Sequence, residues 1–151
     1  MRCRQRFSST VGCITVLLVV MVGVVSGQAV APSPLFIATP LTQVGVFTSG
    51  IEGPACDVDG NVYAVNYERQ GTIGRIRPDG SGEIYVELPQ GSVGNGIRFG
   101  SQREMYVADY VGHNVFEVQL RSRAITIYSH DDNMNQPNDL AMAPSGVLYA
   151  S

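Results

Sequence analysis

Three oxygen-bearing side chains recur at a fixed spacing along this sequence. Glu52, Asn95 and Asn138 each lie 43 residues from the next. A carboxylate together with neutral carboxamide oxygens is a ligand set that suits a hard divalent cation such as Ca²⁺. Asn-Gly and Asn-Asp are also common turn sequences, so Asn95 and Asn138 alone are compatible with ordinary turns. The shared spacing favours a metal site, because turns do not require such an oxygen at the same place three times.

The same spacing extends to the residues around these positions. Tyr63, Tyr106 and Tyr149 are 43 residues apart, and each follows the polar residue of its repeat by eleven positions. A period near 43 is typical of the four-stranded blades of β-propellers. The sequence therefore predicts an all-β protein of the propeller class. A β-sandwich is the alternative, but its strands would not repeat with a fixed period.

Each complete repeat is predicted to hold four short strands separated by Gly, Asp, Asn and Pro turns. A further strand at 41–47 is conceivable from its apolar residues, and a third repeat begins at Asn138. The strands expected in the two complete repeats cover 54–57, 62–66, 72–77, 83–88, 96–99, 105–109, 114–120 and 124–128.

The polar position of each repeat comes just before the innermost predicted strand. In a propeller this junction faces the central tunnel, so equivalent residues of several blades converge there. Asp139 and Arg98 are predicted to face the tunnel as well. Arg98 would either orient an anionic substrate or form an ion pair with a nearby acid.

About two and a third repeats fit into the 151 residues, whereas six blades at this period need roughly 260. We therefore expect the sequence to be the N-terminal part of a longer propeller. Such a part would expose sheet edges and apolar surface, which favours aggregation.

The N-terminus has the layout of a secretory signal peptide. Arg2, Arg4 and Arg6 precede an apolar run at 11–25, and small residues follow it. Cleavage near 27–29 would release a secreted, extracytoplasmic protein, and an uncleaved anchor is the alternative. The predicted organisation is a signal peptide at 1–29, a linker at 30–40 and a partial propeller at 41–151, with blades at about 52–93, 94–136 and 137–151.

Composition excludes several classes of function. The formal net charge is −3 and lysine is absent, which argues against a nucleic-acid partner and against a lysine Schiff base. No membrane partner is expected after signal cleavage. Cys56 is the one cysteine after the leader, and it is predicted to be a small buried residue rather than a reactive thiol.

Four motifs occur in order at blade spacing over about residues 41–151, and together they resemble the SMP-30/gluconolactonase-like family. They are Glu52-Gly53-Pro54-Ala55 with Asp59-Gly60-Asn61-Val62-Tyr63, then Gly94-Asn95-Gly96-Ile97-Arg98-Phe99, Tyr106-Val107-Ala108-Asp109 and Gln136-Pro137-Asn138-Asp139-Leu140.

The resemblance implies a six-bladed propeller with a divalent metal, usually Ca²⁺, in its tunnel. It implies that Glu52 and Asn138 are metal ligands, whereas Asn95 faces the tunnel without always serving as a ligand. The catalytic aspartate of the family is expected beyond residue 151.

The resulting functional hypothesis is a secreted, metal-dependent lactonase-type hydrolase acting on a small-molecule lactone or ester. This activity would belong to the full-length form, since the 151-residue chain lacks part of the expected site. The alternative is a non-catalytic propeller that binds a ligand or partner.

Overall fold

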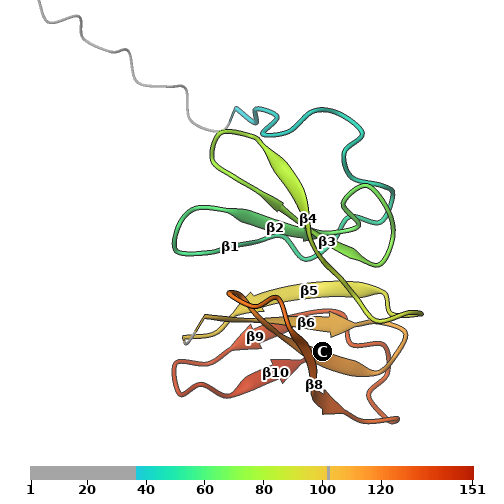
Figure 1. Cartoon of the computed structure of the whole chain (residues 1–151). Helices are drawn as coiled ribbons and strands as arrows, with labels where there is room; N and C mark the ends of the chain where they lie inside the picture. The colour runs from blue at the N-terminus through green and yellow to red at the C-terminus, as the bar shows by residue number, and fades with distance from the viewer. Residues whose placement is uncertain (1–36, 102) are drawn as a thin grey trace, which may run out of the picture. The chain divides into compact units, whose positions relative to one another are not determined.

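A computed structural model describes residues 37–101 and 103–151 (Figure 1). The predicted signal peptide and most of the predicted linker lie outside the described residues. All regular structure in the described part is β, as the sequence predicts. None of its segments is a helix long and apolar enough to cross a membrane.

The first sheet is an antiparallel meander in which each strand pairs with the next along the chain. Its turns contain the residue types that tight turns require. Asp57 Oδ1 accepts hydrogen bonds from the backbone N–H groups of Asp59 and Asn61 at 3.0 and 2.9 Å. The strands are β1 (Ala55–Cys56), β2 (Val62–Val65), β3 (Thr72–Ile76) and β4 (Gly82–Glu87).

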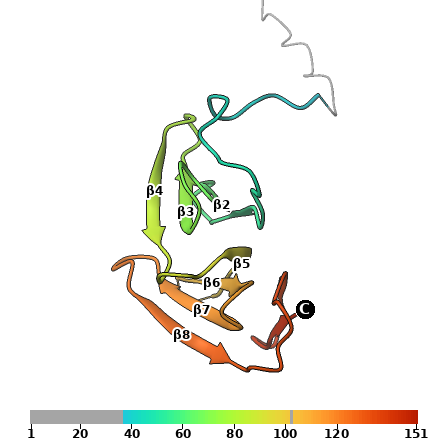
Figure 2. The ribbon, with the colours of Figure 1, turned by 90° about the vertical axis from the view of Figure 1, so that its right-hand side faces the viewer.

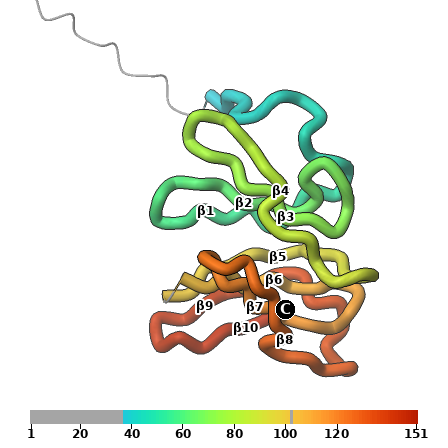
Figure 3. Tube along the Cα trace, viewed as in Figure 1, coloured from blue at the N-terminus to red at the C-terminus, as the bar shows by residue number. Residues whose placement is uncertain are grey.

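The second sheet repeats this topology, and a two-stranded sheet follows it (Figure 2). A segment at 88–93 leads from the outer strand β4 to the inner strand β5, as the chain trace shows (Figure 3). The strands are β5 (Gly94–Phe99), β6 (Glu104–Asp109), β7 (Asn114–Gln119), β8 (Ile125–His130), β9 (Leu140–Met142) and β10 (Leu148–Ala150).

Strand pairing confirms the 43-residue repeat. Tyr63 pairs with Ala55, Tyr106 with Arg98, and Tyr149 with Ala141. The three partners are themselves 43 residues apart. The innermost strands are also neighbours, since β1 contacts β5 and β5 contacts β9. Equal positions in the sequence therefore occupy equal positions in adjacent sheets.

The main hydrophobic core lies between the first and second sheets. Val65 and Ile73 of the first sheet and Ile97 and Val107 of the second are all fully buried in it. A smaller cluster, which includes Tyr106 and Leu140, joins the second sheet to β9. Each sheet thus buries its apolar face against the next one, as blades in a ring of sheets must.

Two expectations from the sequence were wrong. Residues 41–47 form turns instead of a strand, with a single bridge between Phe47 and Tyr67. Gly45 has a φ of +88°, which interrupts an extended strand. Cys56 is exposed rather than buried, because β1 is a two-residue edge strand that pairs only with β2.

Candidate functional site

The residues that the sequence singled out line one open cavity of about 230 Å³. The cavity lies where the three inner strands begin. It brings together side chains from three consecutive repeats, namely Glu52, Asn95, Arg98, Asn138 and Asp139, with Gly53, Pro54 and Gly96 completing the wall. The structure therefore brings these side chains together in one place.

Two glycines let the starts of the inner strands approach one another. A Cβ atom on Gly53 would lie 2.1 Å from the backbone oxygen of Asn95, and one on Gly96 would lie 2.8 Å from that of Asn138. The N–H of Gly96 donates a hydrogen bond to this same Asn138 oxygen at 2.7 Å. The glycine after each of the first two polar residues thus allows direct backbone contact between blades.

Backbone hydrogen bonds hold two of the three polar positions in place. The N–H of Val65 donates to the oxygen of Glu52 at 3.3 Å, and that of Asn138 donates to the oxygen of Ser151 at 2.7 Å. Asn95 lies in an irregular part of the β5–β6 ladder, where the register shifts between Gly94 and Ile97. Such bulges re-aim a side chain relative to the regular sheet.

Arg98 and Asp139 form an ion pair within the cavity. Arg98 Nη2 lies 3.1 Å from Asp139 Oδ1, which also accepts the N–H of Leu140 at 2.8 Å. Arg98 Nη1 donates to its neighbour's backbone oxygen, that of Ile97, at 2.6 Å. Of the two roles that the sequence left open for Arg98, the ion pair with a nearby acid is the one that the structure contains.

The remaining polar side chains of the cavity are free for a ligand. Across 37–101 and 103–151, the side chains of Glu52, Asn95 and Asn138 form no hydrogen bond or ion pair with another protein group. The charge of Asp139 is balanced by Arg98, which leaves the Glu52 carboxylate as the unbalanced charge.

This donor set fits a hard divalent cation. One carboxylate and two carboxamides supply oxygen ligands of low total charge, and Ca²⁺ takes six to eight oxygens, including those of water. No group of three or more His, Cys, Asp or Glu side chains that could hold a metal occurs among the described residues. A cation at this place would therefore depend on the carboxamide oxygens of Asn95 and Asn138.

One buried side chain that was not predicted to be part of the site holds a segment next to the cavity. Asp109 is fully buried, and its carboxylate accepts the N–H of Val93 at 3.0 Å and the side-chain amide of Asn114 at 2.9 Å. It thereby holds the segment just before Asn95.

The first repeat uses the equivalent residue in the same way. Asn66, which lies 43 residues before Asp109, donates to the backbone oxygen of Gly50 at 2.7 Å, just before Glu52. Its Oδ1 atom is buried without a partner. The repeat explains why, because the position of Asn114 is taken in the first blade by Gly71, which has no side chain to donate. The signal in the sequence was the alignment of Asn66-Tyr67 with Asp109-Tyr110.

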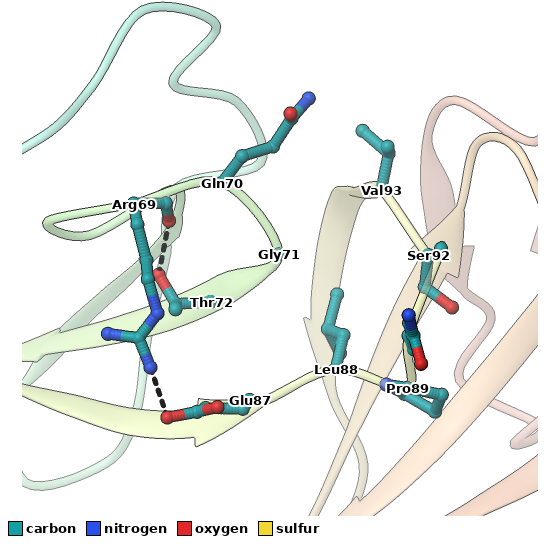
Figure 4. A pocket seen from close by; sticks show the side chains of 11 residues that line it. Arg69, Gln70, Gly71, Thr72, Glu87, Leu88, Pro89, Ser92 and Val93 are labelled. Carbon is teal, nitrogen blue, oxygen red and sulfur yellow. Dashed lines mark hydrogen bonds and ion pairs between the residues drawn. The ribbon is translucent and has the colours of Figure 1, made fainter.

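A larger cavity, of about 540 Å³, lies beside the outer part of the first sheet and the 88–93 segment (Figure 4). The two ionisable side chains in its lining, Arg69 and Glu87, form an ion pair with each other. Thr72 Oγ1 donates to the backbone oxygen of Arg69 at 2.8 Å. Because its charged groups are already paired, this cavity is a weaker candidate than the one at the inner strands.

Comparisons with known proteins support the fold. The sequence matches no protein-family model and no curated protein. Solved structures do match. A structure of virginiamycin B lyase from Staphylococcus aureus is 17% identical over 68% of this chain, with a TM-score of 0.58. A catalytically inactive variant of that enzyme with quinupristin is 19% identical over 69% of this chain, with a TM-score of 0.60. A streptogramin B lyase structure is 17% identical over 71% of this chain, with a TM-score of 0.60.

The chain has the fold of a β-propeller. Its described part holds two four-stranded blades and two strands of a third. The chain spans about a third of the length of these three structures, since the match covers 34 to 35% of each of their chains. At these identities the similarity establishes the fold alone, because one fold can carry many functions.

Proposed function

We propose that the cavity at the inner strands binds a divalent cation, with Ca²⁺ as the preferred ion. The observation that carries this proposal is the meeting of Glu52, Asn95 and Asn138 in one cavity while their side-chain oxygens remain unpaired. Glu52 would supply the charge, and the two asparagines would supply neutral oxygens. This assignment agrees with the ligand roles that the SMP-30/gluconolactonase resemblance implies for Glu52 and Asn138.

The longer propeller is, on this proposal, a lactonase-type hydrolase of that family. A cation held at the cavity supplies Lewis-acid polarisation of a lactone or ester carbonyl. The ion pair of Arg98 and Asp139 forms one wall, where the guanidinium can contact an anionic group of the substrate. The resemblance implies that the general base is an aspartate beyond residue 151, because the cavity's own carboxylates are assigned to the cation (Glu52) and to the ion pair with Arg98 (Asp139).

Two other functions would give results different from those of a hydrolase. A propeller can bind a ligand at the same cavity without catalysis. The three solved structures compared above are lyases by name, so elimination is the second reaction type to assay. Hydrolysis in water enriched with ¹⁸O incorporates one label into the product acid. Elimination incorporates none and creates a new double bond.

Secretion is part of the proposal and rests on the sequence of the leader. Arg2, Arg4 and Arg6 before the apolar run at 11–25 support export. Mass spectrometry of the protein recovered from outside the cytoplasm tests this, since export with cleavage predicts a new N-terminus near residue 28.

Cation binding is tested directly with the 151-residue chain by isothermal titration calorimetry with CaCl₂. We expect Glu52→Gln to weaken binding at least tenfold, because it removes the unbalanced charge of the cavity. Glu87→Gln is the matched control, since Glu87 is an exposed carboxylate at another cavity. Equal affinities of the two variants would contradict the assignment of Glu52 as a ligand.

A further inference from the structure

Most arginines of the described chain gather at the end of the sheets away from the candidate cation cavity. The cavity lies where the inner strands begin, whereas the turns after β1, β3, β5 and β7 lie at the opposite end of the ladders (left side of Figure 1). Five of the seven arginines in residues 37–151 belong to these turns and the adjoining strands, namely Arg75, Arg77, Arg103, Arg121 and Arg123.

Three of these guanidinium groups share one carboxylate. Arg77 Nη2 lies 2.7 Å from Glu83 Oε1, and Arg123 Nη2 lies 3.5 Å from Glu83 Oε2. Arg75 also forms an ion pair with Glu83 Oε1. Because one acid faces three cations, the group retains a net positive charge of two.

The aromatic ring of Tyr85 helps to hold two of these three guanidinium groups in place. The guanidinium carbons of Arg75 and Arg123 lie 5.1 and 4.7 Å from the centre of the Tyr85 ring, which is within the range of cation–π attraction. Arg123 Nη1 donates to the backbone oxygen of Tyr85 at 3.2 Å. Contacts within the protein thus hold these two guanidinium groups in place before any ligand binds.

A pocket of about 360 Å³ opens beside this group. Arg75, Arg103 and Arg121 line it, together with Tyr63 and Tyr85. The side chains of Arg103 and Arg121 are exposed and form no hydrogen bond or ion pair with the rest of the described chain. Their N–H groups therefore remain available to a ligand.

Two carboxylates also line the pocket, and one of them is already engaged. Asp57 Oδ2 accepts hydrogen bonds from the side chains of Asn61 at 2.8 Å and Tyr63 at 3.1 Å. Asp59 is exposed and uncompensated. With Glu83 and Asp79 included, the latter beside Arg77 in the turn after β3, five guanidinium groups face four carboxylates, so the region carries a net charge of +1. Residues 37–151 as a whole, with 13 acids against seven arginines, carry −6.

We propose that this pocket binds a tetrahedral dianion, as inorganic phosphate, sulfate or the phosphate group of a small molecule. Guanidinium groups match the oxygens of such anions with paired, charge-assisted hydrogen bonds. The net positive charge of the region favours an anion over a neutral ligand. The pocket is separate from the candidate cation cavity, so this proposal does not depend on the proposed function.

The test is a calorimetric titration of the 151-residue chain with sodium phosphate at pH 8, in calcium-free buffer of constant ionic strength. Arg121→Gln is the informative variant, because its side chain is exposed and unpaired and its loss leaves the ion pairs of Glu83 intact. We expect this variant to weaken phosphate binding about tenfold. Arg69→Gln is the control, since Arg69 pairs with Glu87 at the other end of the sheets.

Sulfate and acetate separate a dianion site from a general attraction to anions. Binding of phosphate and sulfate with much weaker binding of acetate is the expected result. The proposal is overturned if acetate binds as tightly as phosphate, if Arg121→Gln and Arg69→Gln behave alike, or if no heat of binding is found.

Discussion

The spacing of the inner strands is controlled by single glycines. Gly53 has a φ of +57° and lies so close to Asn95 that a Cβ atom would overlap its backbone oxygen. Gly146 also has a positive φ, of +85°, but a Cβ atom there would meet nothing within 4 Å. A side chain at either position would be strained by the positive φ. Only a side chain at Gly53 would also clash with neighbouring backbone atoms.

Substitution at these two glycines separates the two effects. We expect Gly53→Ala to lower the free energy of unfolding by about 1–3 kcal/mol more than Gly146→Ala, because only the first change forces neighbouring backbones apart. Urea denaturation of both variants measures the difference. Gly53→Ala should also weaken Ca²⁺ binding, whereas Gly146→Ala should not. Equal stabilities would mean that the contact between Gly53 and Asn95 is not needed for the fold.

The sequence could predict which residues meet at the cavity but not how they pair. Glu52, Asn95 and Asn138 come together because a structural repeat brings equal positions to equal places. The Arg98–Asp139 bond joins residues 41 positions apart. No periodic pattern encodes it, and it depends on the contact between two blades. The exposure of Cys56 was missed for a similar reason, because it follows from β1 being a short edge strand.

At the scale of the strands, Glu83 connects β3, β4 and the turn after β7. The hydrogen bond from Arg75, supported by the charges of Arg123 and Arg77, holds the pKa of the Glu83 carboxyl below its ordinary value of 4.5, although partial burial opposes this. A carboxyl whose pKa is lower in the folded state stabilises the fold above pH 4.5. This contribution is lost as the pH falls through the lowered value.

Thermal unfolding between pH 7 and pH 3 tests this connection. We expect the wild-type protein to lose stability below pH 4.5 more steeply than Glu83→Gln, which cannot be protonated at this position. At pH 7 the variant should be the less stable of the two. The matched change Glu87→Gln, in an exposed ion pair, should leave the pH profile nearly unchanged. A Glu83→Gln profile parallel to that of the wild type would show that the arginine contacts do not stabilise the fold.

The strands themselves were largely predictable, and the misassigned segment has a physical explanation. Most strand boundaries agree with the sequence prediction within two residues, because turn residues mark them and apolar residues fill them. Residues 41–47 include apolar side chains, which led to the strand prediction. The segment pairs with another strand only through the bridge of Phe47 with Tyr67, so it does not form a β-strand. Phe47 instead packs edge-on against Tyr67, with ring centres 5.2 Å apart.

At the scale of the whole molecule, the described chain exposes apolar side chains on its outer and last strands. Ile127 and Tyr128 on β8 are 61% and 50% exposed, and Tyr149 on β10 is 61% exposed. Apolar surface of this kind on an edge strand favours association between chains. The sequence predicted this hazard from the number of repeats, since a blade buries its faces only against neighbours.

Light scattering of the 151-residue chain at increasing concentration checks this expectation. We expect Ile127→Lys to reduce association, because it places a charge in the middle of the exposed edge strand. Thr126→Lys, on the same strand, controls for the added charge alone. Association that is insensitive to Ile127→Lys would locate the contact elsewhere on the molecule.

On the proposed function, the starts of three inner strands together form a cation site. Long-wavelength diffraction from crystals of the chain grown with CaCl₂ locates bound Ca²⁺ by its anomalous signal. We expect a peak about 2.3–2.6 Å from a carboxylate oxygen of Glu52 and from the side-chain oxygen of Asn138. A Ca²⁺ peak at another place, with Glu52 and Asn138 left without a ligand, would contradict this expectation.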